Sequence, residues 1–362
     1  MTDYTLITPN KANFLIDLEV VTPVLQIEPT NSSDKDITTK ASMVRTKKRG
    51  FIAESGKLSR YPFFSANGLR GIMRRNIASA LFSDLQKKDG KNVSVATTHL
   101  YASGGGTSNE GINVLNYAEK IDFREKNPFI SIFGAGLSDI DGKLSVTDMS
   151  PEDKDKQMVD FLYGVRFDET ERQSILTPLI DEASVEAYKQ NLANLRKENA
   201  KLRKLEDEIA KLQKELDSLE EEDAELARKL EEIKLEANAI AEEKGMSYQQ
   251  VYKAEFIVPG TKLYSSVGTR GGHALSDIEV GMILYGLLMT SQQNIGSYSR
   301  IGWGVLNWRV KDMDGKTLFK TTADSKYLLS RETEISDEGK KVLSSFVEYV
   351  KNIDRNTIFT MK

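Results

Sequence analysis

Apolar residues recur at every second position near the N-terminus and predict a β-strand. The positions concerned are Phe14, Ile16, Leu18 and Val20. A period of two places them on the same side of an extended chain, so we expect a strand with one buried face. Thr22–Pro23 and then residues 28–48 are polar and rich in turn-forming residues. We therefore expect a long excursion from the core that ends near Tyr61–Pro62.

A helix should follow this excursion, because apolar residues recur there at helical spacing. They are Leu69, Ile72, Met73, Ile77, Ala80, Leu81 and Leu85. Ser65 or Asn67 can cap the helix by accepting hydrogen bonds from its first amides. The helical period puts Asn67, Arg70 and Arg74 together on the face opposite the apolar stripe. The sequence thus predicts a basic helix face.

Two stretches in the middle of the chain predict different structures. Residues 86–150 are rich in Gly and Asn and contain only short apolar runs, so we expect loops, hairpins and short strands rather than a second core. Residues 184–244 contain no Gly or Pro, and their Leu and Ile residues keep the three-four spacing of a heptad seam. We predict a coiled-coil insertion that reverses near Asp217–Asp223, because a folded-back pair of helices buries its own seam.

The pattern after the insertion completes an α+β fold. We expect, in order, a hairpin of residues 251–258 and 262–267, a helix opened by the capping-box sequence Ser276–Glu279, a strand containing Leu306, Trp308 and Val310, and a C-terminal helix over 336–352. This order predicts a ferredoxin-like (RRM-like) core. Residues 1–183 and 245–362 would together form that core, and residues 184–244 the inserted helical hairpin.

Charge is distributed unevenly along the chain. The net charge is −4, but residues 185–244 alone hold 17 acidic and 12 basic residues. Residues 40–75 hold ten basic residues and a single acid, Glu54. Such a dense positive stretch repels itself unless an anion relieves it, and a nucleic acid is the polyanion that does so most effectively. The distribution indicates a nucleic-acid partner.

Residue usage excludes several kinds of chemistry. The chain has no cysteine, and its only histidines are His99 and His273, which have no metal-ligand spacing. We therefore expect no disulfide, no metal site, no cofactor and no thiol nucleophile. No apolar run reaches transmembrane length and no signal-peptide pattern follows Met1, so we expect a cytoplasmic protein without a membrane partner.

Arginines and glycines at the start of the predicted helix suggest a phosphate contact. Arg70 and Arg74 lie one turn apart, and Gly68 and Gly71 flank the first of them. Like charges at this spacing and Gly inside a helix are both unfavourable. Both are understandable if a phosphate backbone passes over the helix N-terminus, where amides and the helix dipole favour an anion. The alternative is a solvated basic face whose glycines merely begin the helix.

The glycine-rich loop Gly296–Gly304 is a second candidate contact. It combines Ser297, Tyr298, Ser299 and Arg300 with the indole of Trp303. One turn would then offer a nucleic acid a backbone that it can approach closely, hydroxyl groups, a cation and a ring for base stacking. The alternative is a tight turn between helix and strand, with Trp303 in the core.

Three motifs of this chain resemble the signatures of the RAMP superfamily of CRISPR-associated proteins, in the same order. They are Ser65–Arg75 (SANGLRGIMRR), Ile132–Gly134 (IFG) and Gly296–Gly304 (GSYSRIGWG). The Leu-Arg-Gly form with paired arginines, preceded by Tyr-Pro, is most similar to the type IV (Csf-type) member of the seventh Cas family. The resemblance covers about three-quarters of the chain, all but the coiled coil.

This resemblance implies a backbone subunit with an RRM-like palm and inserted finger and thumb elements. Copies would line up head to tail along a CRISPR guide RNA, beside other effector-complex subunits, and present the guide to a target nucleic acid. The residues expected to bind RNA are Arg45, Lys47, Lys48, Arg49, Ser65, Asn67, Arg70, Arg74, Arg75, Arg270, Ser297, Tyr298, Ser299, Arg300 and Trp303. The coiled coil departs from the family pattern and leaves the thumb unassigned.

Our first hypothesis is a non-catalytic guide RNA-binding backbone subunit. Related type III subunits cleave target RNA through an aspartate in the excursion after the first strand, and Asp34 and Asp36 lie there in this chain. A metal-dependent endoribonuclease is therefore the alternative, although Asn, Ser and Asp are also ordinary turn residues. A third hypothesis is a scaffold whose coiled coil recruits a partner.

Overall fold

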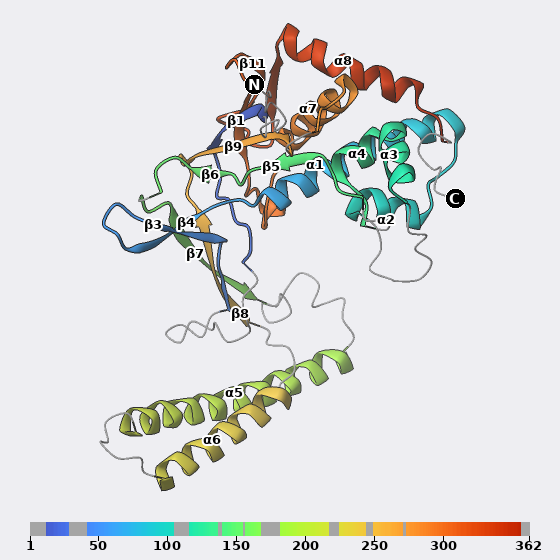
Figure 1. Ribbon diagram of the computed structural model, residues 1–362. Coiled ribbons are helices and arrows are strands. Elements are labelled where there is room, and N and C mark those ends of the chain that lie inside the picture. The colour runs from blue at the N-terminus through green and yellow to red at the C-terminus, as the bar shows by residue number, and fades with distance from the viewer. Residues whose placement is uncertain are drawn as a thin grey trace. The chain divides into compact units, whose positions relative to one another are not determined.

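The computed structural model describes residues 12–28, 42–104, 116–136, 140–154, 156–167, 182–216, 224–243, 249–270 and 273–355 (Figure 1). The chain divides into two compact units. The main unit comprises Met1–Asp34, Met43–Leu162 and Ala254–Lys362, and the second unit comprises Lys35–Ser42 and Tyr163–Lys253. None of the described helices has the length and apolarity needed to cross a membrane.

A seven-stranded antiparallel sheet forms the centre of the main unit. Its strands are β1 (Ala12–Val20), β5 (Leu144–Val146), β6 (Ser150–Pro151), β9 (Lys262–Thr269), β10 (Leu306–Lys311), β11 (Thr317–Ala323) and β12 (Arg331–Ile335). Their order is β12-β11-β10-β1-β9-β5, and β6 also pairs with β9. The expected strand over Phe14–Val20 is confirmed, and its four alternating apolar side chains are buried. The strand containing Trp308 is confirmed as β10.

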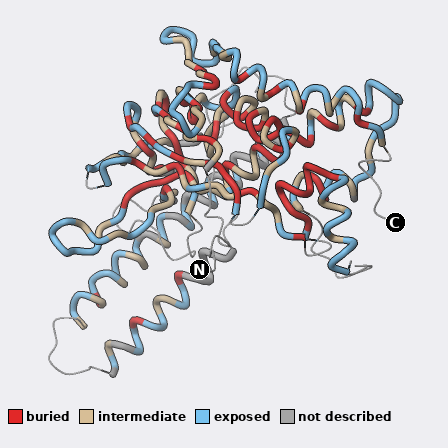
Figure 2. The backbone as a smooth tube through the Cα atoms, turned by 45° about the horizontal axis from the view of Figure 1, so that its top comes forward, coloured by how far each residue is buried: buried red, intermediate tan, exposed pale blue. Residues whose placement is uncertain are grey.

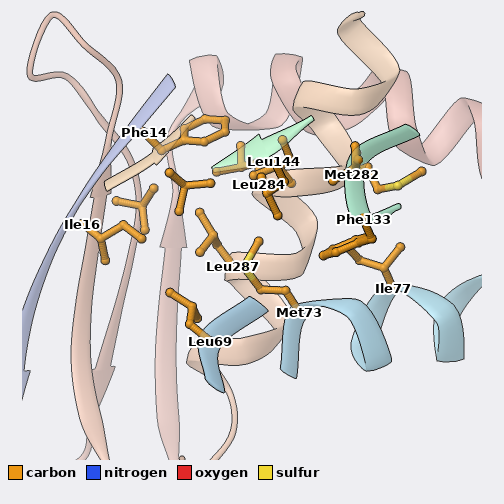
Figure 3. Close-up of a cluster of buried hydrophobic side chains, with 14 of the residues drawn as sticks. Phe14, Ile16, Leu69, Met73, Ile77, Phe133, Leu144, Met282, Leu284 and Leu287 are labelled. Carbon is orange, nitrogen blue, oxygen red and sulfur yellow. The ribbon is translucent and has the colours of Figure 1, made fainter. Parts of the chain in front are cut away.

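Three long helices pack in the main unit. Helix α1 (Ala66–Asp89) contacts α7 (Asp277–Ser291), and α8 (Asp337–Asn352) packs on α7 and β11. Figure 3 shows the apolar side chains of α1 and α7 meeting those of β1. A Cβ on Gly286 of α7 would lie 2.8 Å from Ile77 Cδ1, so the two helices approach too closely for a larger residue. All three helices were expected, and the capping box of Ser276 and Glu279 is confirmed.

These elements make an α+β fold, as expected. The order β1, α1, β5, β9, α7, β10 follows the β-α-β-β-α-β succession of a ferredoxin-like unit when the intervening segments are set aside. The finer ferredoxin-like assignment stays a prediction. Figure 2 shows that buried positions concentrate in this sheet and its helices.

The expectation of loops, hairpins and short strands over residues 86–150 is only partly right, because the short strands are confirmed but the helices were not expected. This region contains α2 (Val95–Ser103), α3 (Tyr117–Lys126) and α4 (Pro128–Phe133) in addition to the short strands β5 and β6. Asn116 caps α3, and Asn127 caps α4 with Pro128 in its first turn. Tyr101 stacks on Phe129 with ring centroids 4.6 Å apart, so these helices extend the core.

The expected hairpin on either side of Pro259–Gly260 is wrong. Both strands exist, but β8 (Gln249–Ile257) lies in a separate sheet of order β2-β8-β7, with β2 at Ser42–Val44 and β7 at Val159–Phe167. Strand β9 already pairs with β1 on one side and with β5 and β6 on the other, so neither of its edges is open to β8. The excursion before α1 also contains a hairpin of β3 (Lys48–Ile52) and β4 (Leu58–Pro62).

The second unit contains the expected pair of helices, α5 (Glu182–Leu216) and α6 (Ala224–Glu243). Lys201 pairs with Glu236 at 2.8 Å, and Glu208 pairs with Lys229 at 3.9 Å. Seven residues forward on α5 therefore correspond to seven residues back on α6, which is the register of antiparallel helices. The helical hairpin is thus confirmed. The reversal expected near Asp217–Asp223 lies outside the described residues.

Candidate nucleic-acid interface

The first turn of α1 is held by side chains from elsewhere in the main unit. Ser65 caps it, because its hydroxyl accepts a hydrogen bond from the Gly68 amide at 3.2 Å. Gln26 accepts from the Ser65 amide at 2.6 Å and donates to the Ser65 hydroxyl at 2.8 Å. Asp148 accepts from the Ala66 amide at 2.7 Å. Ser65 therefore caps the helix. The amides of Ala66 and Gly68, in the turn expected to attract a phosphate, already donate to side chains of the protein.

The glycines of this helix have different reasons to be there. A Cβ on Gly68 would lie 2.6 Å from Gln26 Nε2 and 2.8 Å from Phe64 Cε1, so packing alone requires a glycine. A Cβ on Gly71 would meet only the Arg75 guanidinium, at 3.4 Å. Asn67, Gly71 and Arg75 recur every fourth residue, and Asn67 and Arg75 are exposed. The accessible stripe of α1 thus runs along these three positions.

Arg74 lies in the interior, so the expectation that it shares an open basic face is wrong. Its side chain is only 8% exposed. Its Nε donates to the Tyr101 carbonyl oxygen at 2.6 Å, and its Nη2 donates to those of Leu100 at 2.8 Å and Gly134 at 3.1 Å. Burial, followed by the charge of Arg70, lowers the pKa of Arg74 to about 10, which leaves it a cation at neutral pH. Helices α2 and α4, which were not expected, bury this part of α1.

Arg70 is half-buried and lies close to a second arginine. Its Nη2 donates to the Phe133 carbonyl oxygen at 2.6 Å. Burial, and then the charge of Arg270 at the end of β9, lower the pKa of Arg70. Arg270 is more exposed, with its Nη1 3.6 Å from a carboxylate oxygen of Asp141. The two guanidinium groups therefore repel each other beside one exposed acid, and a phosphate would relieve that repulsion.

The glycine-rich loop is fixed by its own backbone against the segment after β1. Ser297 donates its amide to the Leu25 carbonyl oxygen at 2.7 Å, and Gly304 donates to that of Pro23 at 2.8 Å. A Cβ on Gly304 would overlap the Ile295 carbonyl oxygen, and this residue has a positive φ of 84°. Gly304 is therefore required by close backbone packing rather than by the approach of a ligand.

The side chains of this loop divide into buried and accessible ones. Trp303 is 8% exposed and lies between the rings of Tyr298 and Phe256, each with its centroid 5.1 Å away. The expectation of an open stacking indole is wrong, and the alternative that places Trp303 in the core is closer to the structure. Tyr298 has a positive φ of 59°, an unfavourable conformation for a non-glycine residue that is often found at functional sites. Ser299 is half-buried and Arg300 is exposed.

The basic residues before α1 are partly neutralised. Lys48 forms an ion pair with the buried carboxylate of Glu255. Arg49 pairs with Asp148 at 2.6 Å and lies over the Phe63 ring. Acidic side chains from distant parts of the chain therefore offset part of the positive charge of this stretch.

The other two basic residues of this stretch are on a short bridged segment. Arg45 is exposed and Lys47 half-buried. Their backbones bond Glu28 and Gln26, which ties them to the residue that holds Ser65. Sequence analysis missed Gln26, Asp148 and Glu255, because each is a single polar residue without a local pattern.

The three sequence motifs meet around the start of α1. The Phe133 carbonyl of the second motif accepts from Arg70 of the first. A Cβ on Gly296 of the third would lie 3.6 Å from the Phe64 ring, which also packs on Gly68. The part of the chain that the structure describes has no group of three or more His, Cys, Asp or Glu residues placed to hold a metal ion. Asp34 and Asp36 lie outside the described residues.

Comparison with solved structures found chains of similar fold. No family model matches the sequence, and no curated protein does. A solved structure described as a type IV-B CRISPR complex contains a chain that is similar, with a TM-score of 0.45 and 13% sequence identity. The similarity covers 83% of this chain and 91% of that one.

Proposed function

We propose that this protein is a non-catalytic subunit that binds a CRISPR guide RNA and oligomerises along it in a type IV-like effector complex. The observation that carries the proposal is the meeting of three motifs, far apart in sequence, around the first turn of α1. Three motifs that serve one ligand are expected to lie together in the folded chain.

The accessible side chains around that point suit an RNA backbone. Asn67 and Arg75 are exposed along α1, and Arg270 and Arg300 are exposed on the neighbouring β9 end and glycine-rich loop. They supply cations and one amide, which are groups that bind phosphate and ribose rather than base edges. A subunit that accepts any guide should recognise it in this sequence-independent way.

RNA binding is tested by reversing charge at accessible positions only. The double variant Arg75→Glu/Arg270→Glu should weaken binding to single-stranded RNA at least tenfold and reduce the slope of log affinity against log salt by about 1.4, since each lost phosphate contact accounts for about 0.7. The control Lys316→Glu/Lys341→Glu changes two exposed lysines on elements without a motif and should bind as the wild type does. Equal affinities of the two double variants would contradict the proposal.

Guide identity and assembly need the native context. Purification from cells that carry the neighbouring genes, followed by sequencing of the bound RNA, should return CRISPR-derived guides. Native mass spectrometry should show several copies of the chain on one guide, with more copies on a longer guide. A single copy at every guide length would exclude assembly along the RNA.

Absence of catalysis is tested with the assembled complex. Labelled RNA complementary to the guide should remain intact in the presence of magnesium. Specific cleavage that is lost in Asp34→Ala or Asp36→Ala would replace the proposal with the endoribonuclease alternative. The scaffold hypothesis would instead be favoured if deletion of the helical hairpin removed a partner and left guide binding intact.

A further inference from the structure

A groove of about 660 Å³ lies beside the glycine-rich loop in the main unit. Its walls are three segments: residues 22–23 after β1, residues 299–303 of the loop, and residues 326–329 between β11 and β12. The last segment belongs to no sequence motif. The volume is within the range of small-molecule sites in proteins, about 300–1,000 Å³.

Large apolar side chains are exposed around this groove. Tyr327 is 62% exposed, Ile301 60% and Leu329 80%. Trp303 also lines the groove, and the rings of Tyr298 and Phe256 hold it in place. Apolar surface that gathers at one hollow indicates a site for a ligand with a flat or apolar part.

The loop that carries Tyr327 is held in one conformation. A carboxylate oxygen of Asp324 accepts hydrogen bonds from the amides of Lys326, at 2.7 Å, and Tyr327. The Tyr327 carbonyl accepts from the Ser330 amide at 2.7 Å, and the Ser330 carbonyl accepts from the Asp324 amide at 2.9 Å. The opposite wall is equally fixed, because the Thr22 hydroxyl donates to the Gly302 carbonyl at 2.9 Å. A ligand would therefore meet a preformed site and lose little free energy to ordering of the protein.

The charges at the groove are all positive. Arg300 and Lys326 line it, both are exposed, and no Asp or Glu is among the lining residues. The acid nearest in sequence, Asp324, is engaged by backbone amides. The combination of two cations with the exposed Tyr327 ring suits a molecule that is both aromatic and anionic, which is the chemistry of a nucleotide. The Lys326 ammonium lies over one face of the Tyr327 ring, 5.4 Å from its centroid, which leaves the other face for a base.

We propose that this groove binds one unpaired nucleobase of single-stranded RNA, with the base stacked on Tyr327 and its phosphate beside Arg300 and Lys326. The inference rests on the proposed function, since it adds a base-binding subsite to the phosphate-binding surface of α1.

The first experiment tests the groove without RNA. The chain has two tryptophans, and Trp308 is fully buried, so a ligand-dependent change in fluorescence reports on Trp303. Adenosine 5′-monophosphate in the millimolar range should quench saturably, whereas ribose 5-phosphate should not. Quenching should be lost in Tyr327→Ala and kept in Tyr327→Phe, which retains the ring. The control Tyr117→Ala removes a tyrosine that is 79% exposed on α3, away from the groove residues, and should change nothing.

The second experiment uses RNA and separates this inference from the proposed function. Tyr327→Ala should weaken binding of a single-stranded RNA at least about fivefold, as expected for one lost stacking contact, without changing the salt dependence. Arg75→Glu/Arg270→Glu should flatten the salt dependence and leave quenching by the mononucleotide intact. Failure of the wild type to bind RNA would refute the proposed function. Unchanged quenching and RNA affinity in Tyr327→Ala would refute the groove alone.

Sedimentation of the same variants tests whether a second copy of the chain occupies the groove instead of a nucleobase. If the groove holds a second copy of the chain, Tyr327→Ala should reduce self-association while mononucleotide quenching and RNA affinity stay at the wild-type level. That result would overturn the nucleobase proposal in favour of a protein contact.

Discussion

The burial of Arg74 makes a strong prediction about stability, which Arg74→Met tests. Methionine keeps an unbranched apolar stem beside the rings of Phe129 and Phe133, over which the guanidinium lies. It removes every hydrogen bond that the guanidinium donates. We expect a folded but much less stable protein whose remaining native fraction still binds RNA.

The magnitude follows from the four carbonyl oxygens to which the guanidinium donates, which are those of Leu100, Tyr101 and Gly134 and, at 3.4 Å, that of Phe133. The Leu100 carbonyl also accepts from the Gly104 amide, and the Phe133 carbonyl also accepts from Arg70, so these two oxygens keep a donor. The hydrogen bonds from the charged guanidinium to the Tyr101 and Gly134 carbonyls, at 2.6 Å and 3.1 Å, make up most of the cost of the substitution. At about 1.5–3 kcal/mol for each such bond, the free energy of unfolding should fall by about 3–6 kcal/mol. A loss of this size is a large part of the usual total stability and should lower Tm by roughly 10 °C.

The matched control is the neighbouring residue. Arg75 is exposed on the same helix, and Arg75→Met should leave Tm within a degree or two of the wild type while weakening RNA binding. Differential scanning fluorimetry and an RNA titration at a temperature where both variants are folded separate the two effects. The reasoning is refuted if Arg74→Met has the same Tm as the wild type but has lost RNA affinity, because Arg74 would then contact the ligand directly.

Three further predictions concern other parts of the chain. Gly304→Ala should destabilise the main unit strongly, because its Cβ would overlap the Ile295 carbonyl oxygen at a positive φ, and a normal melting curve would contradict this. Arg355 lowers the pKa of Asp89 to about 2, so this pair should stabilise the fold above pH 4 and lose its contribution as the pH falls towards 2. Asp89→Asn should therefore lower Tm at pH 7 and have no effect below pH 2, as thermal melts across that range would show. Replacement of residues 185–244 by a short Gly/Ser linker should leave a folded, RNA-binding protein, since α5 and α6 bury their seam against each other; aggregation or loss of a cooperative melt would contradict it.

Periodic patterns accounted for most of the elements that could be predicted from sequence. Strand β1 and helices α1 and α8 each extend over enough residues for one face to become buried as a whole, so their periods are readable in isolation. The paired helices α5 and α6 were predictable for the same reason. Helix α7 is buried on most sides, and its capping box and apolar run predicted it instead. Helix α4 is six residues long and entirely buried, so it has no polar face to create a period.

The candidate site was only partly predictable, because burial depends on contacts between distant segments. Arg74 has the same local pattern as an exposed arginine, and only the unexpected arrival of α2 and α4 makes it internal. The charge of Lys48 was counted correctly, but its partner Glu255 follows more than two hundred residues later. A local charge count cannot include such a partner.

Motif residues therefore cannot be assigned to a ligand by their type alone. Gly68 and Gly304 are fixed by van der Waals distances and Arg74 by carbonyl oxygens, so substitutions there disturb the fold whatever the protein binds. Asn67 and Arg75 have no comparable constraint and remain accessible. Because the constrained residues hold the accessible ones in place, loss of RNA binding after a motif substitution is informative only when the fold is measured in the same variant. Exposed residues outside the motifs, such as Tyr327 in the groove, avoid this ambiguity and offer the cleaner test of how the chain holds its nucleic acid.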